Sequence, residues 1–309
     1  MTLVTHQNDT AIRSWCHSAT DKQSSNIKST LAKNTEDATK FDVPRHIAFI
    51  CDGNSRWAET KSLPNSIGHA TGAERVVNLI SLLRQRKSQT KVSGINATLV
   101  EPQRIQYCTL FAFSTENWSR PTSEITAIFK LIEKMAIQYQ KTDAIKNGQV
   151  QIEVLGDLDD SRIPVGMRKE LEKLQYDSRA ACNKKRAGGM KYDDKLTVCL
   201  AINYGGRADI MQAAMKLAQS IASGDIPPDA INNESEISKH LSTANLPDPD
   251  LIIRTGGEKR LSNFLLWDAA YAELYFSDVL WPDFDEGALE EALMWYGKRT
   301  RRFGGRDKE

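Results

Sequence analysis

Short apolar runs alternate with amphipathic stretches along this chain from about residue 43 onward. The apolar runs predict strands near 46–51, 106–113, 150–155, 196–202 and 250–253, and a shorter strand near 272–276. Apolar positions at three- and four-residue spacing predict helices over about 66–87, 123–142, 165–184, 207–223 and 286–302. Such alternation is typical of a parallel sheet covered by helices. We therefore predict an α/β fold, a single domain with a mainly parallel central sheet of about six strands.

Polar stretches interrupt this pattern. Residues 1–42 are rich in Ser and Thr and lack apolar periodicity, which fits either a disordered extension or an organelle-targeting segment for a plastid or mitochondrion. Residues 88–104 are a polar excursion that we interpret as an inserted surface loop. Residues 225–249 are loop-rich around one short helix near 235–242. The folded domain is expected to span 43–309.

Composition narrows the function classes. A chain of 309 residues with 40% hydrophobic content can bury a sizeable core, and a net charge of +1 gives no general attraction to nucleic acid. The chain has no apolar run of about 18 residues that would span a membrane. Five cysteines without metal-ligand spacing indicate reduced structural thiols. We expect a cytoplasmic or membrane-peripheral protein, with organelle targeting left open by residues 1–42.

The segment after the predicted strand at 250–253 is the clearest chemical signal. It reads Arg254-Thr-Gly-Gly-Glu-Lys-Arg260-Leu-Ser262 and supplies two guanidinium groups, a hydroxyl and a glycine pair. Guanidinium forks and backbone N–H groups gathered at one point bind phosphate or diphosphate. The expected ligand is a dense anion.

A second candidate site follows the predicted strand at 46–51, where the sequence is Asp52-Gly-Asn-Ser-Arg56-Trp. A lone carboxylate among phosphate-binding groups would repel the ligand unless a divalent cation lay between them, and oxygen ligands with phosphates suit Mg²⁺. Each motif alone also fits an ordinary turn or a surface ion pair. Together, at the carboxyl ends of two strands of an open sheet, they predict one site for two diphosphates and a metal.

Motifs in a fixed order carry a family resemblance. They are His46-Ile-Ala-Phe-Ile-Cys-Asp-Gly-Asn-Ser-Arg-Trp57 with Gly68-His69, Phe113-Ser-Thr-Glu-Asn-Trp-Ser-Arg-Pro121, Asn203-Tyr-Gly-Gly-Arg207, and Ile253-Arg-Thr-Gly-Gly through Tyr271-Ala-Glu-Leu-Tyr-Phe276. The chain resembles the cis-prenyltransferases, the undecaprenyl and dehydrodolichyl diphosphate synthases, over about residues 43 to 305. The resemblance implies an enzyme that transfers a prenyl group, condensing isopentenyl diphosphate with an allylic diphosphate to give a Z-configured prenyl or polyprenyl diphosphate.

The resemblance also implies roles for individual residues. Asp52 and Glu273 would bind Mg²⁺. The allylic diphosphate would be surrounded by Gly53, Asn54, Ser55, Arg56 and Arg120, and the diphosphate of isopentenyl diphosphate would be held by Arg254, Arg260 and Ser262. His69, Ser114 and Asn117 would lie near the reacting ends, although capping or turn formation explains the same residues.

Aromatic and apolar positions leave two interpretations open. Trp57, Phe113 and Trp118 either wall a tunnel for an isoprenoid tail or form ordinary core. The stripe over the predicted helix 123–142 packs on the sheet and, in the family, also lines the chain-elongation tunnel. Product length depends on the depth of that tunnel and stays open, as does the allylic starter.

The chain departs from the family pattern at Cys51, Ser55 and Asn65, where Met, Gly or Arg, and Arg are common. These changes put rate and substrate preference in doubt but remove no metal-binding or isopentenyl-diphosphate group. A noncatalytic or weakly active subunit of a heteromeric enzyme is the alternative, disfavoured because the aspartate and arginines are present. The trans-prenyltransferases are excluded, since the chain lacks their paired Asp-Asp-x-x-Asp clusters.

Assembly is expected to be homodimeric. The segment Tyr271 to Trp281 has few charges and many large apolar residues, a composition typical of a buried contact. In the family, a C-terminal motif matching Arg302 and Gly304 reaches the partner subunit's isopentenyl-diphosphate site, although an ordinary basic tail explains the same residues. Membrane contact would be at most peripheral, through a long apolar product.

Overall fold

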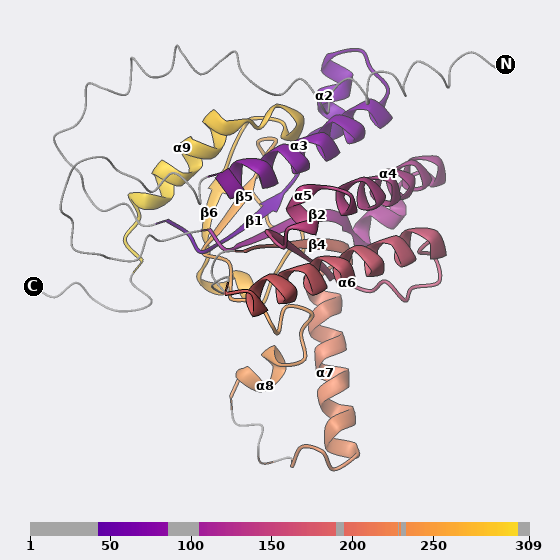
Figure 1. The fold of residues 1–309 in the computed structure, drawn as a ribbon, viewed down its shortest axis with the longest axis vertical. Coiled ribbons are helices and arrows are strands. Elements are labelled where there is room, and N and C mark those ends of the chain that lie inside the picture. Colours follow the sequence, from indigo (N-terminus) through magenta and orange to yellow (C-terminus); the bar gives the residue numbers. More distant parts are fainter. Residues whose placement is uncertain (1–42, 86–104, 190–194, 228, 230–232, 302–309) are drawn as a thin grey trace, which may run out of the picture. The chain divides into compact units, whose positions relative to one another are not determined.

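The strands of the protein form one parallel sheet (Figure 1). The structure is a computed structural model that describes residues 43–85, 105–189, 195–227, 229 and 233–301. The strands are β1 (His46–Ile50), β2 (Tyr107–Ser114), β3 (Val150–Leu155), β4 (Leu196–Tyr204), β5 (Leu251–Arg254) and β6 (Glu273–Phe276). They pair in the order β3-β4-β2-β1-β5-β6, and every pairing is parallel. The predicted α/β fold is confirmed, with each strand within a few residues of its expected place.

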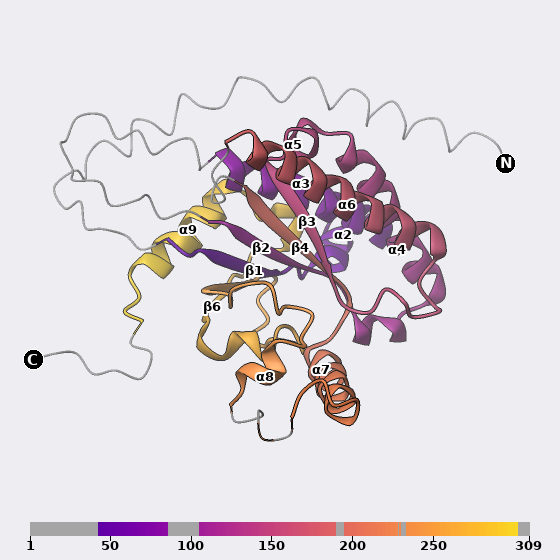
Figure 2. The same ribbon diagram turned by 60° about the horizontal axis from the view of Figure 1, so that its bottom comes forward.

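The helices connect these strands. They are α2 (Asn54–Thr60), α3 (Asn65–Gln85), α4 (Thr122–Gln140), α5 (Asp143–Lys146), α6 (Val165–Ala187), α7 (Gly206–Ala222), α8 (Ser235–Ser238) and α9 (Glu286–Gly297), with 3₁₀ turns η3 (Thr115–Ser119), η6 (Asp268–Tyr271) and η7 (Trp281–Asp283). Figure 2 shows α3, α4, α5 and α6 on one side of the sheet and α7 and α8 on the other. Among the described residues, no helix has the length and apolarity needed to cross the lipid bilayer.

Each face of the sheet has its own core. On one face, the apolar side chains of β1, β2 and β4 pack against α3, α4, α6 and α9, in a cluster that includes Phe49, Leu110 and Trp281. On the other face, Ala48, Ile50 and their neighbours on β4 and β5 pack under the segment around Phe264 and Leu265. Both faces of β1 are therefore buried, as expected of a central parallel strand.

Two element boundaries differ from the prediction. No helix was predicted for residues 54–60, which form helix α2, beginning directly after Gly53 at a φ of 106°. A helix of seven residues is too short to show a clear apolar period. The last helix, expected to continue to 302, ends at Gly297, as glycine near a helix end favours. Side-chain pairs of Arg299 with Glu273 and of Arg301 with Asp250 hold the chain beyond it.

Several predicted segments lie outside the described residues. These are the extension 1–42, the inserted loop 88–104, and Arg302 and Gly304. In the described part of 225–249, α8 is the only α-helix. Cys51, Cys108, Cys182 and Cys199 carry free thiols, as predicted, and burial raises the pKa of Cys199 to about 12.

Candidate active site

The loops that follow β1 and β5 meet at the carboxyl edge of the sheet. The two strands are neighbours, and Ile50 lies opposite Arg254. The chain leaves β1 for β2 on one side, and β5 is inserted on the other, so this edge is where the strand order reverses, the usual ligand position in open α/β sheets. Thr255 joins the loops, because its Oγ1 accepts from Asp52 N at 3.0 Å and donates to Asp52 O at 2.8 Å.

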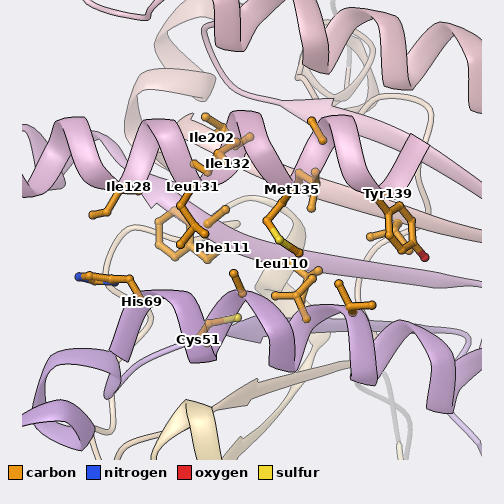
Figure 3. A pocket seen from close by; sticks show the side chains of 18 of the residues that line it. Cys51, His69, Leu110, Phe111, Ile128, Leu131, Ile132, Met135, Tyr139 and Ile202 are labelled. Atoms are coloured by element: carbon orange, nitrogen blue, oxygen red, sulfur yellow. The ribbon is translucent and has the colours of Figure 1, made fainter. Parts of the chain in front are cut away.

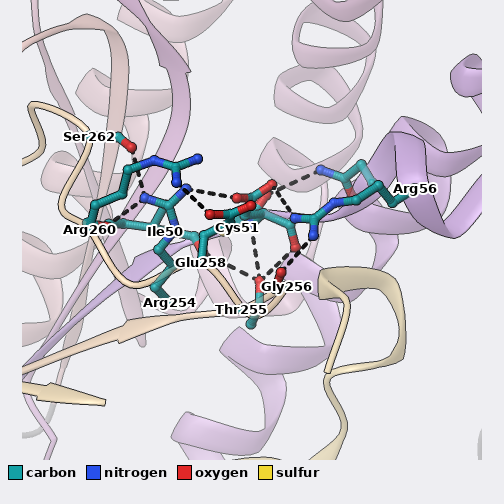
Figure 4. Close-up of polar contacts among 11 residues, drawn as sticks. Ile50, Cys51, Arg56, Arg254, Thr255, Gly256, Glu258, Arg260 and Ser262 are labelled. Carbon is teal, nitrogen blue, oxygen red and sulfur yellow. Dashed lines mark hydrogen bonds and ion pairs between the residues drawn. The ribbon is translucent and has the colours of Figure 1, made fainter. Parts of the chain in front are cut away.

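Asp52 contacts two arginines of these loops, Arg56 and Arg254, and Figure 4 shows those two side chains approaching from opposite sides. Its Oδ1 is 3.1 Å from Arg56 Nη2, and its Oδ2 accepts a 2.8 Å hydrogen bond from Arg254 Nη2. Burial acts to raise the pKa of Asp52, but hydrogen bonds and charge from Arg254 and Arg56 lower it below its ordinary value. Asp52 is therefore a carboxylate at neutral pH, and 30% of its side chain is exposed. We call Asp52, Arg56, Arg254, Thr255 and Gly256 the polar edge.

Arg254 organises this edge. Its side chain is only 5% exposed, and besides Asp52 it donates from Nη1 to Arg260 O at 2.5 Å and to Ser262 Oγ at 2.7 Å. These bonds leave Nε as a buried donor without a partner. The prediction that Arg254 grips a diphosphate therefore needs refinement, because most of its donors hold the loop 254–262 in shape.

The backbone of this loop contradicts one expectation. We predicted that N–H groups after β5 point at an anion, but Gly256 N donates to Val279 O at 2.8 Å and Gly257 N to Ser277 O at 2.9 Å. The loop continues to pair with the segment after β6, a long-range contact that the local sequence does not reveal. Gly256 is needed there, since its φ is 84° and a Cβ would lie 2.6 Å from Arg56 Nη2. Positive charge at this edge comes from side chains.

Helix α2 places Asn54, Ser55 and Arg56 beside the edge. Arg56 Nη1 donates to Gly256 O at 2.7 Å, which ties α2 to the β5 loop. Asn54 fits closely against α3, where a Cβ at Gly72 would lie 2.1 Å from Asn54 Oδ1. That oxygen is buried and has no hydrogen-bond partner.

Arg260 is an exposed cation of the loop, next to the exposed Lys259. Its side chain is 59% exposed and pairs with Glu258. Ser262 has a φ of 49° and accepts from Arg254, so the hydroxyl predicted to bind substrate also stabilises the loop. Arg260 is free to turn toward an anion in the way that Arg254 is not.

His69 and Arg120 come together through a residue that we had not predicted. Glu124 Oε1 is 3.2 Å from His69 Nε2 and 2.9 Å from Arg120 Nη1. Burial lowers the pKa of His69, and the hydrogen bond to Glu124 opposes that effect. The ring is therefore mostly neutral at pH 7.

Ser114 and Asn117 form a capping box at the start of η3. The backbone N of Ser114 donates to Asn117 Oδ1 at 2.9 Å, and the Ser114 side chain accepts from the backbone of Asn117. The turn-forming alternative is thus observed in this structure. A contact with substrate stays a prediction for both residues.

An apolar cavity of about 180 Å³ lies between α3, α4, α6 and the sheet (Figure 3). Cys51, Asn54 and His69 line its polar end. The remaining wall is almost entirely apolar and includes Val76, Val77, Ile80, Leu110, Ile128, Leu131, Ile132, Met135, Ala136, Leu174 and Ile202. Figure 3 shows His69 and Tyr139 at opposite ends of the row of side chains. The predicted stripe on α4 faces this cavity.

The three candidate aromatic residues do not line the cavity. Phe113 is 1% exposed and packs against Trp118 and Phe129. Trp118 donates from Nε1 to Asn203 at 2.8 Å, and Trp57 donates to Asp283 at 2.8 Å. Phe113 therefore has the predicted core environment, and the two tryptophans are held by hydrogen bonds, while a substrate contact stays a prediction for all three.

Glu273 lies away from Asp52 within one chain. It is opposite Leu251 at the start of β6, three residues before the position opposite Arg254, and it pairs with Arg299 at 3.0 Å. That puts it about 10 Å along the strands from the carboxyl edge. In the described part of the chain, no group of three or more His, Cys, Asp or Glu residues could hold a metal. Metal binding by Glu273 stays a prediction that the geometry of one chain does not support.

The segment from Tyr271 to Trp281 is only partly a surface. Tyr271 is 66% exposed, but Trp281 is 1% exposed, stacks on Phe284 and donates from Nε1 to Gly72 O at 2.8 Å. The composition that we attributed to an interface therefore belongs, at its C-terminal end, to the core of the same chain.

Sequence reasoning missed Glu124, Thr255 and the α3 wall of the cavity. The α3 wall had a signal, because Val76, Val77, Ile80 and Leu83 recur at helical spacing. Thr255 lies within the predicted Arg-Thr-Gly-Gly motif but had no assigned role. Glu124 had no local signal, since one of its partners is 55 residues away.

Comparisons with known proteins agree with the geometry. The undecaprenyl diphosphate synthase family model of prenyltransferases matches residues 50–304. The chain is 39% identical over 275 residues to isoprenyl transferase 2 of Bradyrhizobium diazoefficiens, covering 89% of this chain and 95% of that one. It is 39% identical to the ditrans,polycis-undecaprenyl-diphosphate synthase ((2E,6E)-farnesyl-diphosphate specific) of Shewanella oneidensis, covering 86% of this chain and 84% of that one.

A solved structure is also similar. Lavandulyl diphosphate synthase from Lavandula x intermedia, in complex with dimethylallyl diphosphate, superposes with a TM-score of 0.71 at 31% identity, covering 85% of this chain and 98% of that one. With a family model that matches most of the described domain, the chain belongs to the cis-prenyltransferase family of undecaprenyl diphosphate synthases and is a prenyltransferase.

Proposed function

We propose that this prenyltransferase condenses isopentenyl diphosphate with an allylic diphosphate in a Mg²⁺-dependent reaction, giving a Z-configured prenyl or polyprenyl diphosphate. The observation that supports this is the loop from Cys51 to Asn54, which belongs both to the polar edge and to the wall of the apolar cavity. An allylic diphosphate has the same two parts. Its diphosphate fits the arginines and its hydrocarbon tail fits the cavity.

The main barrier in prenyl transfer is charge separation as the diphosphate leaves, so aligned cations are the appropriate catalysts. Arg56, Arg120 and Arg260 have 43%, 36% and 59% of their side chains exposed and can turn toward a diphosphate. Arg254 holds the frame in which they act. A covalent enzyme intermediate is not required.

Mg²⁺ suits the donor set. Asp52 offers a partly exposed carboxylate that stays ionised, and Mg²⁺ is commonly bound through one or two carboxylates together with substrate phosphates and water. When bound, the ion would neutralise charge on the diphosphate. Asp52 would hold it beside the arginines.

Assembly and starter are part of the proposal. We expect a homodimer, because Leu274, Tyr275 and Phe276 remain partly exposed on the edge strand β6. Light scattering on the purified chain tests this, and a monomer that is fully active would refute it. Since one relative is named for farnesyl diphosphate and another was solved with dimethylallyl diphosphate, the starter has to be measured.

The experiment is incubation of the purified chain with radiolabelled isopentenyl diphosphate and dimethylallyl, geranyl or farnesyl diphosphate, with Mg²⁺ or with EDTA. Product length is read by chromatography. We expect labelled product with at least one starter and none with EDTA. No product with any starter would refute the proposed reaction, and equal product with EDTA would refute the metal.

A further inference from the structure

Glu124 bridges two candidate site residues that come from different parts of the chain. It lies in the first turn of α4, whereas Arg120 precedes that helix and His69 belongs to α3. The carboxylate accepts from Arg120 at 2.9 Å and contacts His69 Nε2 at 3.2 Å. The side chains of His69 and Glu124 are 13% and 22% exposed, so water competes weakly for this contact.

This contact selects one form of the histidine. A carboxylate only accepts hydrogen bonds, so the nitrogen that faces it must carry the hydrogen. In a neutral imidazole, Nε2–H leaves Nδ1 as the acceptor. The charged groups that act on the ring are Glu124, which favours its protonated form, and Arg120, which opposes it.

His69 also lines the apolar cavity, together with Asn54 and Cys51, and Figure 3 shows it at the end of the row opposite Tyr139. That is where the reacting carbon of an allylic substrate lies if its diphosphate is at the polar edge and its tail is in the cavity. Each condensation must release one proton there. The described residues that line this end offer no other side chain that is a neutral base at pH 7.

We propose that Glu124 is a positioning residue that holds His69 with Nε2–H toward the carboxylate, so that Nδ1 accepts the proton released in each condensation. The inference rests on the proposed function. The allylic C1–O bond breaks and its electron pair leaves with the diphosphate. The double bond of isopentenyl diphosphate forms the new bond to C1 of the allylic substrate. C2 of isopentenyl diphosphate then loses a proton to Nδ1 of His69, and the electrons of that C–H bond form the new double bond. Glu124 then stabilises the imidazolium, as a buried carboxylate does for a catalytic histidine.

A double-mutant cycle separates this role from simple packing. We expect Glu124→Gln to lower kcat by about 10- to 100-fold and His69→Gln by about 100-fold or more. Because Glu124 acts through His69, the double variant should be no more than about threefold slower than His69→Gln alone. Glu172→Gln, an exposed change on α6, is the matched control and should leave kcat unchanged.

The pH dependence gives a second readout. Loss of the carboxylate removes an interaction that favours the imidazolium, so the acid limb of kcat in Glu124→Gln should move to lower pH as its plateau falls. Glu124→Asp, which keeps the charge, should restore the position of that limb. A structural defect alone would lower the plateau without moving the limb.

The tautomer can be measured without turnover. In ¹⁵N-labelled, ligand-free protein, the ring-nitrogen resonances of His69 are assigned as those that disappear in His69→Gln. In the wild type, these resonances should have the chemical shifts of the Nε2–H tautomer. The Nδ1–H tautomer, or single-variant effects that multiply in the double variant, would overturn the proposal. If the wild type makes no prenyl product, both the proposed reaction and the role of His69 as its base are refuted. The tautomer measurement still decides whether Glu124 orients His69.

Discussion

The polar edge and the apolar cavity share the loop from Cys51 to Asn54 but are built in opposite ways. The edge is fixed by directional bonds, among them Thr255 to Asp52, Arg56 to Gly256 O, and Arg254 to Ser262. The cavity wall is made of apolar side chains from the sheet and from α3, α4 and α6 on one side of it, and its shape depends on the volumes of those side chains. A displacement of about 1 Å at the edge moves the charged side chains relative to the leaving diphosphate and weakens its stabilisation. The same displacement in the cavity wall changes only the volume of the cavity.

This difference implies that the two regions control different quantities. The edge acts on the leaving diphosphate and should control rate. The cavity holds a growing hydrocarbon chain and should control product length. Substitutions in one region should leave the other quantity nearly unchanged.

The largest effect is expected for Asp52→Asn. The amide keeps the size of the side chain but removes the charge that would bind Mg²⁺, so turnover should fall about 10²- to 10³-fold while product length stays the same. Steady-state assays with labelled isopentenyl diphosphate measure both. Asp159→Asn is the control, because Asp159 is 94% exposed in the loop after β3. Activity within tenfold of the wild type would contradict the metal assignment.

A smaller effect should separate the two substrate positions. Arg260→Ala should raise the Michaelis constant for isopentenyl diphosphate about tenfold or more, because a charge-assisted contact is lost, and that for the allylic substrate much less. Arg179→Ala, at a similarly exposed arginine on α6, serves as the control. If both constants rise equally, the two diphosphate positions have been assigned wrongly.

The same contrast explains what the sequence could predict. The apolar runs located β1 and β5, and a parallel sheet brings their carboxyl ends to one edge, so the approach of Asp52 to Arg254 followed from pattern alone. The engagement of Gly256 N by Val279 did not follow, because it depends on how a distant segment folds back. The short helix α2 has no apolar period that would reveal it in the sequence. The contact of Glu124 with His69 joins two elements and has no local sequence signal.

The sequence predicted an apolar wall on α4 but not the complete lining of the cavity. The α4 stripe indicated an apolar wall, whereas the contribution of Val76 and Ile80 from α3 required the packing of two helices. Phe113 shows the limit of the argument, since an aromatic residue next to polar site residues belongs to the core. Adjacency in sequence does not decide which side of a strand faces a ligand.

Cavity substitutions should change the product with little effect on rate. Tyr139 lies at the end of the row opposite His69 (Figure 3), so Tyr139→Ala frees the space of a phenol ring and should lengthen the product by about one five-carbon unit. We expect kcat within about threefold of the wild type. Tyr176→Ala, at a tyrosine that is 74% exposed, is the control. Chromatography of the products measures the shift, and an unchanged length would show that this wall does not limit the chain.

The smallest effect concerns the dependence of the free energy of unfolding on pH. The arginines hold the pKa of Asp52 below its ordinary value of 3.8, so the charged carboxylate stabilises the folded state above the unfolded pKa, and this contribution is lost as pH falls through the lower folded pKa. The free energy of unfolding should therefore decline more steeply between about pH 5 and pH 3 in the wild type than in Asp52→Asn. The difference between the two slopes should be modest, because the side chain is 30% exposed.

Tyr139→Ala is the control. Burial raises the pKa of Tyr139, which keeps its hydroxyl neutral in this range, so this variant should lower the free energy of unfolding by the same amount at both pH values. Urea unfolding of the three proteins measures these slopes. Parallel slopes for the wild type and Asp52→Asn would mean that the arginines do not stabilise the carboxylate, and the polar edge would then owe its shape to the backbone bonds of Thr255 and Gly256.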